Sequence, residues 1–345
     1  MNRENLLEKL ELVKPALAKN DLVKVLKHFW FYEDALIAYN DQIAIQTKLA
    51  SNFKGAIPDT LVALVKASRA KDIEFSEVVK GQLVIKAASG KFKLPFLPEE
   101  ETHIFDMPEP DPDRNKLPLD METFLEAVES CMRSLKEDPS MPDSLGITVI
   151  FEEKALKLYA TNDATISYSQ VSTPELVSCG TRVVLSGSFC RQMLSIAKLE
   201  GKKHVEIRED YSLFQCGDVV LFGRLVDVPK PLDFDAVVLS SFPKEAKKNL
   251  VSVPTKLELM LDRACVIGDK TSIVVEGGIA KFLSKSDKGE VRDSVQLEPN
   301  HPDVSIDINP RLFRNGYGHF DKMLMTENCL VMFNGTNLYL VSASM

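Results

Sequence analysis

Side chains that could bind a metal or act as nucleophiles are scattered along this sequence. The cysteines form no C-x-x-C pair, and the histidines lie far from them and from one another. A zinc site needs several such ligands at paired spacing, so we expect no metal site. The cysteines are instead typical of buried, reduced thiols in a cytosolic protein. These residues are Cys131, Cys179, Cys190, Cys216, Cys265, Cys329, His28, His103, His204, His301 and His319.

Motifs that carry catalysis are also missing from the sequence. It contains no G-x-x-x-x-G-K-[ST] phosphate loop, no G-x-G-x-x-G, no H-E-x-x-H and no G-x-S-x-G. Neighbouring acids such as Glu152 and Glu153 can do acid–base work, but runs of this kind are more typical of solvated loops. We therefore predict no catalytic residues and no cofactor, which favours a binding or scaffolding role. An enzyme that processes nucleic acid and an adaptor without a DNA role stay open as alternatives.

Length and composition describe a folded protein of two or three domains. The chain has 345 residues, of which 45% are hydrophobic and 27% charged, so disorder is excluded. No apolar run approaches the ~18 residues of a membrane span, and the first residues are not a signal peptide. The 42 basic and 50 acidic residues give 42 − 50 = −8, which argues against a coat protein that is basic all over.

Two amphipathic helices recur three times along the chain, with apolar residues at helical spacing. In each third, residues that alternate with the period of a β-strand follow, among them Ile43, Ile45 and Thr47. The expected first helices carry Leu6, Leu7, Leu10, Val13 and Leu17, then Phe124, Leu125, Val128, Met132 and Leu135, then Leu257, Met260, Leu261 and Ala264. The expected second helices carry Leu61, Val62, Val65 and Ser68, then Phe189, Met193 and Ala197, then Phe313, Tyr317, Phe320 and Leu324.

Each third also ends in a hairpin signal, and proline-rich joints separate the thirds. Ser89-Gly90, Gly217-Asp218 and Asn334-Gly335 stand between alternating apolar residues, where a tight turn is expected. Prolines break the chain at 108–113 and at 229–250. The sequence therefore predicts an α+β protein of three repeated domains, at residues 1–113, 117–238 and 245–345. Three unrelated α+β domains are the alternative.

Several segments in this order resemble the bacterial DNA sliding clamp, the beta subunit of DNA polymerase III. The opening RENLL resembles the family's first helix, and LPFLP at 94–98 resembles the end of its first domain. LYATND at 158–163 is similar to its "vATDGHRL" segment, RLVD at 224–227 to "kLVDGrFPDY", and YLV at 339–341 to its C-terminal tail. The resemblance covers essentially the whole chain and lies in the order of the segments.

The sequence departs from the family at two places. DATI replaces the Gly-His-Arg-Leu turn at 163–166, and SASM replaces the Met-Pro-Met-Arg-Leu tail at 342–345. A divergent member carried by a virus of bacteria fits these departures. The resemblance implies a cytoplasmic protein, in a bacterial cell or in an infected host, with no membrane partner.

The resemblance implies a ring that closes as a head-to-tail homodimer of six domains around duplex DNA. Basic residues on the leftover helix faces would attract phosphates without reading sequence, although solvated helices often carry such charges. The expected DNA-facing residues are Lys66, Arg69, Lys71, Arg133, Lys136, Arg191, Lys198, Lys256, Arg263, Arg311, Arg314 and Lys322.

The family's polymerases and clamp loader bind through short peptide motifs, so the resemblance also implies a groove between the second and third domains. The alternative for Leu340 and Val341 is that both are simply part of a strand core. The expected groove residues are Leu145, Thr161, Thr165, Ile166, Pro231, Val237, Leu340, Val341, Ser342 and Met345.

Overall fold

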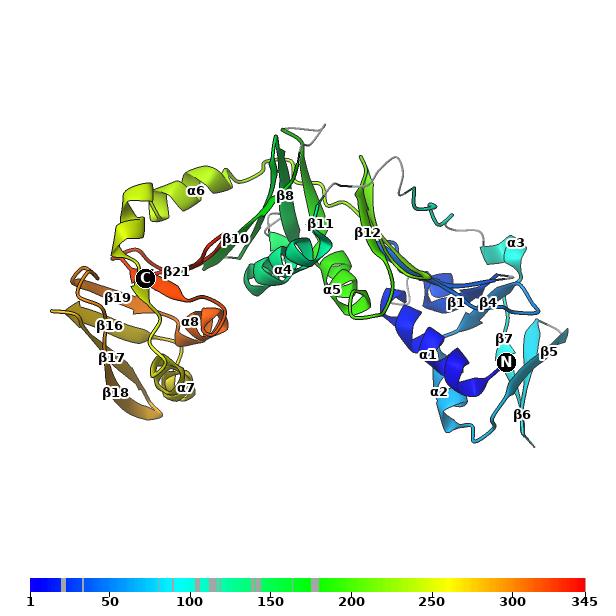
Figure 1. Ribbon diagram of the computed structural model, residues 1–345. Coiled ribbons are helices and arrows are strands. Elements are labelled where there is room, and N and C mark those ends of the chain that lie inside the picture. The colour runs from blue at the N-terminus through cyan, green and yellow to red at the C-terminus, as the bar shows by residue number, and fades with distance from the viewer. Residues whose placement is uncertain are drawn as a thin grey trace. The chain divides into compact units, whose positions relative to one another are not determined.

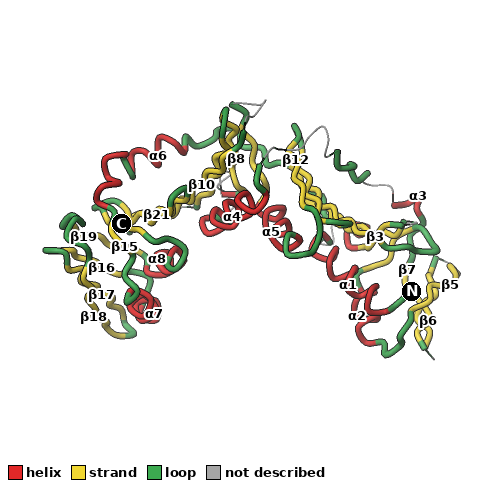
Figure 2. Tube along the Cα trace, in the orientation of Figure 1, coloured by secondary structure: helices red, strands yellow, loops and turns green. Residues whose placement is uncertain are grey.

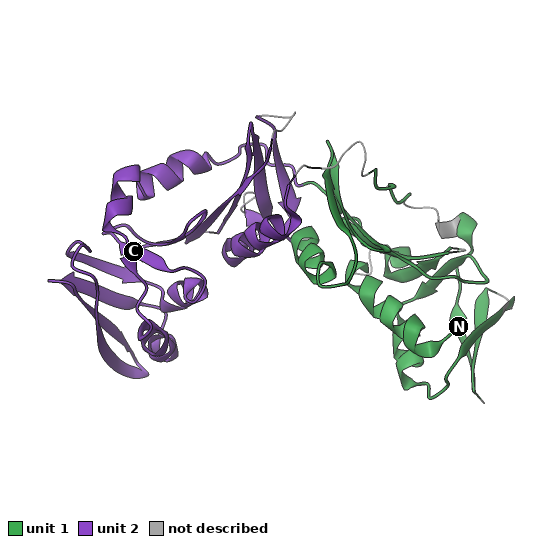
Figure 3. Ribbon diagram, in the orientation of Figure 1, with its two compact units in different colours: residues 1–117, 188–225 green, residues 118–187, 226–345 purple. Residues whose placement is uncertain are grey.

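The computed structural model describes the chain as two compact units (Figures 1 and 3). Unit 1 comprises residues Met1–Leu117 and Ser188–Leu225, and unit 2 comprises Pro118–Gly187 and Val226–Met345. The structure describes residues 1–19, 23–32, 34–79, 81–88, 90–102, 106–111, 117, 119–137, 140, 144–162, 164–174 and 180–344. Ser89 of the first expected hairpin, and Met345, lie outside these ranges.

Helices are separated by runs of strands along the described chain (Figure 2). The α-helices are α1 (Arg3–Val13), α2 (Thr60–Ala67), α3 (Glu99–Thr102), α4 (Met121–Cys131), α5 (Gly187–Ile196), α6 (Phe234–Ser241), α7 (Leu257–Ile267) and α8 (Pro310–Gly316). Short 3-10 helices span Lys14–Ala16, Lys24–Lys27, Met132–Ser134 and Lys244–Asn249. No helix among the described residues is long and apolar enough to span a membrane.

The described strands form four antiparallel sheets. They are β1 (His28–Phe31), β2 (Ala35–Tyr39), β3 (Ile43–Lys48), β4 (Gly55–Pro58), β5 (Ile73–Val79), β6 (Gln82–Ala87), β7 (Gly90–Pro95), β8 (Gly146–Glu152), β9 (Ala155–Thr161), β10 (Thr165–Ser172), β11 (Arg182–Ser186), β12 (Lys203–Ile207), β13 (Tyr211–Cys216), β14 (Val219–Arg224), β15 (Val251–Ser252), β16 (Thr271–Glu276), β17 (Ile279–Ser286), β18 (Gly289–Gln296), β19 (Val304–Ile308), β20 (Lys322–Met325), β21 (Cys329–Asn334) and β22 (Asn337–Ser342).

Short polar side chains cap the first turns of several helices, and apolar residues on one face of each helix are buried in the core. Asn2 accepts a hydrogen bond from the Asn5 amide at 3.1 Å, and Asp120 accepts one from the Thr123 amide at 2.9 Å. Asn309 caps α8, and Pro310 follows it at the first helical position. Along α1 the predicted residues Leu6, Leu10 and Val13 are buried.

The same order of elements occurs three times, as the repeats predict. The first copy runs from α1 to β7, the second from α4 to β14 and the third from α7 to β22. Each contains a helix, four strands, a second helix and three strands. The four strands lie in the order β3-β2-β1-β4, β10-β9-β8-β11 and β18-β17-β16-β19, and the last three strands are always sequential. Three unrelated domains would not share this order, so the repeat is confirmed.

One turn has the same side-chain hydrogen bonds in the first and second copies. The side-chain oxygen of Asn40, between β2 and β3, accepts from the amides of Gln42 and Ile43 at 3.1 and 2.9 Å. Asn162, between β9 and β10, accepts from the amides of Ala164 and Thr165 at 2.9 and 2.8 Å. Asparagine favours such turns because its side chain imitates a backbone acceptor.

Sheets in this fold are shared between copies. Strand β14 of the second copy pairs with β3 of the first, which makes a seven-stranded sheet inside unit 1. Strand β22 of the third copy pairs with β10 of the second, which makes an eight-stranded sheet inside unit 2 with β15 at its far edge. A four-stranded sheet (β18-β17-β16-β19) and a three-stranded sheet (β5-β6-β7) remain.

One expectation about local structure is wrong. The last helix was expected to extend to Leu324, but α8 ends at Gly316, and the positive φ of 84° at Gly318 turns the chain before β20. The proline-rich joint at 229–250 contains a further helix, α6, whose first turn Asp233 caps through the Ala236 amide at 3.0 Å.

His301 holds the loop before β19 against β20 in unit 2. The backbone amide of Met325 donates to its Nε2 at 3.0 Å, so Nδ1 carries the proton and donates to the Pro302 carbonyl at 2.8 Å. Burial lowers the pKa of His301 below its ordinary value of 6.5, although Pro302 and Asp303 favour the charged form. The folded chain therefore binds this proton less readily than the unfolded chain.

We predict that the free energy of unfolding falls as the pH drops below about 6.5, partly because His301 must gain a proton that breaks its bond to Met325. A His301→Gln variant should be less sensitive to acid than the wild type, because glutamine has no imidazole to protonate. The measurement is urea unfolding followed by circular dichroism between about pH 5 and about pH 8. An identical pH dependence in both proteins would contradict this role.

Candidate functional site

The basic residues predicted in the helical part of unit 1 are mostly solvent-exposed. Lys66 on α2 makes an ion pair with Glu11 at 2.5 Å, with both side chains partly exposed. Arg69 and Lys71 follow α2 as exposed residues, and Arg191 and Lys198 are exposed on and just after α5. These five side chains are available to solvent, which the expected contact with phosphates requires.

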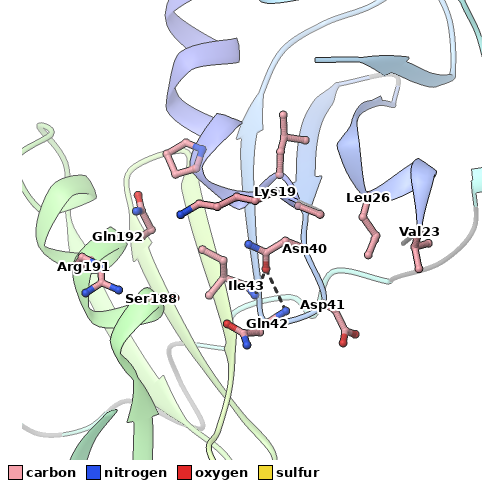
Figure 4. A pocket seen from close by; sticks show the side chains of 13 residues that line it. Lys19, Val23, Leu26, Asn40, Asp41, Gln42, Ile43, Ser188, Arg191 and Gln192 are labelled. Carbon is pink, nitrogen blue, oxygen red and sulfur yellow. Dashed lines mark hydrogen bonds between the residues drawn. The ribbon is translucent and has the colours of Figure 1, made fainter. Parts of the chain in front are cut away.

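One cavity of unit 1 brings some of these groups together with residues that the sequence did not single out (Figure 4). It has a volume of about 480 Å³ and lies between the end of the Lys14–Ala16 helix, the β2–β3 turn and the start of α5. Lys19 and Arg191 line it together with the side-chain amides of Asn40, Gln42 and Gln192 and the carboxylate of Asp41. Most of these groups can donate hydrogen bonds, so the cavity is suited to an anionic oxygen.

The basic residues of unit 2 are more fully neutralised by acids. Arg314 on α8 contacts Asp262 at 2.8 Å and Glu258 at 3.1 Å, and both acids belong to α7. Arg263 pairs with Asp293 at 2.8 Å, and Arg311 pairs with Asp269 at 3.3 Å. Lys256 and Lys136 are exposed. The α7–α8 surface therefore carries both signs of charge.

Two of the expected DNA-facing residues differ from the rest. Arg133 is half-buried, its Nε has no hydrogen-bond partner among the described residues, and burial lowers its pKa. Lys322 lies on strand β20 and not on a helix, with Nζ 2.9 Å from the Ser252 hydroxyl. Because residues two apart share a strand face, Lys322 lies with Leu324 on the face opposite Met323 and the α7–α8 core. The prediction that Lys322 belongs to a helix face is wrong.

The eight-stranded sheet has an apolar outer face that collects several of the expected groove residues. Ile166, Leu340 and the partly buried Val237 lie in one cluster with Phe234 and Phe242. Ile166 and Leu340 are directly opposite each other across β10 and β22, and Thr161 faces Ile166 from β9. Residues from three strands and α6 thus meet on one surface, although they are far apart in sequence.

The remaining groove residues divide between this face and other places. Ser342 is opposite Cys329 on the same face, and its hydroxyl donates to the Ala164 carbonyl at 3.1 Å. Pro231 is exposed just before α6, and Leu145 is half-buried before β8. Met345 lies outside the described residues.

Thr165 and Val341 do not line this face. They are paired with each other one position away from Ile166 and Leu340, so their side chains point to the opposite side of the sheet. Val341 is fully buried there with Tyr339 in the core beneath α7 and α8. Of the two readings for Val341, the strand core is therefore the one that the packing supports, whereas Leu340 lies on the outer face.

Sequence reasoning missed the contacts that fix α6 to the sheet. The Tyr159 hydroxyl donates to Asp235 on α6, and Lys157 lies 3.0 Å from the same carboxylate. The ring of Phe234 stacks on Tyr159 with centroids 4.8 Å apart, and the Arg182 guanidinium lies over the Phe234 ring, 5.5 Å from its centroid. Although burial opposes it, the bonds from Tyr159 and Lys157 hold the pKa of Asp235 below its ordinary value. The Asp233 cap was the available signal in the sequence.

Groups of three or more metal-ligating side chains do not occur within the described ranges.

A scan of family models and a search of curated protein sequences each found no match.

Solved structures, however, resemble this chain over its full length. The beta subunit of DNA polymerase III from Thermotoga maritima has a TM-score of 0.82 at 20% identity, and the alignment covers 100% of this chain and 98% of that one. A putative beta subunit from Eubacterium rectale has a TM-score of 0.85 at 14% identity, with 99% and 98% covered. The Caulobacter crescentus beta subunit has a TM-score of 0.83 at 16% identity, with 100% and 99% covered. From its first helix to its last strand, this chain has the fold of the DNA polymerase III beta subunit, the bacterial sliding clamp.

Proposed function

We propose that this protein is a DNA sliding clamp, a non-catalytic processivity factor that encircles duplex DNA and tethers a replicative polymerase. The observation that carries the proposal is the pair of open sheet edges at the two ends of the repeat. Among the described strands, β7 pairs only with β6, and β18 pairs only with β17. Strand β7 is the counterpart of β14 and β22 in the other copies, and β18 is the counterpart of β3 and β10. Because these counterparts pair with each other inside the chain, a second copy of the chain can pair β7 with β18 at both edges.

The internal junctions give the register of this pairing. Val219, the first residue of β14, is opposite Thr47, the fifth residue of β3. Asn337, the first residue of β22, is opposite Ser169, the fifth residue of β10. The equivalent residues of the open edges are Gly90 and Asp293, which would place Lys93 opposite Glu290. A head-to-tail dimer with this register has no free edge at either junction.

Apolar side chains beside β18 support the same interface. Val266 and Leu259 on α7 are 71% and 69% exposed, unusual values for large aliphatic residues. The end of α7 lies along β18, because Arg263 bonds to Asp293 of that strand. The Ser286 hydroxyl, at the end of the neighbouring β17, donates to the Ile267 carbonyl at 2.6 Å. A partner that pairs with β18 would cover this end of α7.

The basic side chains of the helices would face the DNA. Exposed Lys and Arg attract phosphates without reading bases, and each contact adds a small increment. The cavity beside Lys19 and Arg191 would receive one backbone phosphate. With the acids of α7 nearby and a net charge of −8, free affinity for DNA should be low, so topology must retain the protein.

Polymerase and clamp loader would dock on the outer-face cluster beside α6. The buried Ile166 and Leu340 and the partly buried Val237 form its apolar cluster, with the polar side chains of Thr161 and Ser342 at one end. A short peptide that inserts one or two large side chains suits such a surface. The protein would work in the cytoplasm of a bacterial cell or of a cell infected by a bacterial virus.

The dimer register predicts a specific disulfide. With Lys93→Cys and Glu290→Cys in one chain, mild oxidation should give covalent dimers, because directly opposed residues lie within the Cα separation that a disulfide spans. The measurement is non-reducing gel electrophoresis. The control pairs Lys93→Cys with Val291→Cys, which puts the thiols on opposite faces of the sheet. Equal cross-linking in both variants would contradict the register.

Encirclement predicts that retention depends on the form of the DNA. Protein loaded on a nicked circle should survive high salt, because escape requires an interface between subunits to open. Cutting the circle should release it from the free ends. The measurement is protein bound before and after linearisation at raised salt. An ordinary electrostatic binder would leave both forms at the same salt concentration, and that result would sink the proposal.

The docking surface predicts that Val237→Asp abolishes the stimulation of primer extension by DNA polymerase III, because it places a charge on a half-buried apolar site. Ala236→Asp, on the exposed side of the same helix, is the matched control and should behave like wild type. The dimer mass should be unchanged in both. Normal stimulation by folded, dimeric Val237→Asp protein would rule out this surface.

A further inference from the structure

A second groove lies on the outer face of the eight-stranded sheet, one row further along than the Ile166 cluster. It has a volume of about 400 Å³, within the range of ligand pockets. Tyr168, Leu338 and Phe333 form its floor, since Tyr168 is opposite Leu338 and Leu338 is opposite Phe333 across neighbouring strands. None of the residues expected in the partner groove lines this one, although Phe242 and Leu338 belong to the same apolar cluster as Ile166 and Leu340.

The helical segment above the sheet supplies a fixed apolar wall. Leu239 and Phe242, from α6 and the residue after it, line the groove. Leu239 is 52% exposed, whereas Phe242 is buried against the sheet. Because Tyr159 and Lys157 hold Asp235 on the first turn of α6, the wall is anchored independently of any ligand. An exposed leucine on an anchored wall is available to a partner.

The groove has a positive charge once the ion pairs among its own residues are set aside. Asp235 is satisfied by Lys157 and Tyr159, and Lys157 also pairs with Glu152 at 2.7 Å. Lys244 and Lys247 stand at the rim on the 3-10 helix, are exposed, and make no ion pair with any described residue. In a chain of net charge −8, two such lysines beside an apolar floor favour an anionic ligand.

The aromatic rings of the floor are already covered, which bears on the class of ligand. The ammonium of Lys247 lies over the Phe333 ring at 5.2 Å, and Phe242 packs beside that ring at 6.1 Å. Tyr168 packs against Tyr159 with centroids 4.9 Å apart. Nucleic-acid bases bind single-strand sites by stacking on open ring faces, and these contacts already cover one side of the Phe333 ring and one side of the Tyr168 ring. An aliphatic or aromatic side chain can still pack against Leu239 and Leu338.

We propose that this groove binds a short acidic segment of a partner protein, anchored by one large apolar side chain beside Leu239. The carboxylates of the segment lie against Lys244 and Lys247. The geometry that supports this site is confined to unit 2, and the proposal does not depend on the DNA role.

The test uses the full-length protein and a short fluorescein-labelled peptide of Asp, Glu and Ser residues with one central Phe. Fluorescence anisotropy should detect binding by the wild type. The Lys244→Glu/Lys247→Glu variant should weaken it roughly tenfold or more, since both rim charges are reversed. The matched control is Lys154→Glu/Lys230→Glu, which makes the same change in charge at two exposed lysines of unit 2 outside the groove, and it should bind like wild type.

A second peptide, with Ser in place of Phe, tests the apolar anchor and should bind much more weakly. In the Leu239→Ser variant the two peptides should bind with the same affinity. Circular dichroism checks that the variant is folded. Three results would overturn the proposal: no binding by the wild type, equal binding of both peptides, or displacement of the acidic peptide by oligothymidine. The last would assign the groove to single-stranded nucleic acid.

Discussion

Antiparallel pairing between strands of different copies is the interaction on which the rest of the structure depends. An unpaired strand edge exposes backbone donors and acceptors, and folded proteins must pair or protect it. Here β3 finds its partner in the second copy and β10 finds its partner in the third. These pairings bring Ile166 beside Leu340 and build the outer face to which α6 is attached. They also leave β7 and β18 unpaired at one edge, and in the proposed dimer the same kind of pairing would close these two edges.

The elements of the fold were predictable because their signals are local. Helical spacing located α1, α4 and α7, and the hairpin at Gly217 follows from a glycine that accepts the positive φ of a tight turn. The partner of a strand is not a local property, so alternation in β3 revealed a strand but not its pairing with β14. Resemblance to a family supplied what periodicity could not, namely the expected ring and the groove expected between the second and third domains.

The site was less predictable, for reasons that particular residues make clear. Val341 and Leu340 are adjacent, equally apolar and on opposite faces, and only the register of β22 separates them. Lys322 was assigned to a helix because its neighbours have helical spacing, yet Gly318 ends that run. The anchoring of α6 depends on Tyr159 and Asp235, which are 76 positions apart. Contacts at such separations leave no mark in composition or spacing.

Shared sheets also set the order in which this chain can finish folding. Ile43 of β3 is opposite Gly223, and Thr165 of β10 is opposite Val341, so the ladders close across 223 − 43 = 180 and 341 − 165 = 176 positions. At about 5–20 residues per second, a ribosome needs on the order of ten seconds or more to supply each partner. During that time β3 and then β10 remain as exposed edges on a growing chain. The first copy can collapse early around α1 and α2, but the seven-stranded sheet must wait for the second copy. Late closure of long-range ladders makes folding slow and exposes it to aggregation, so the nascent chain is the stage of this protein's life most in need of a chaperone.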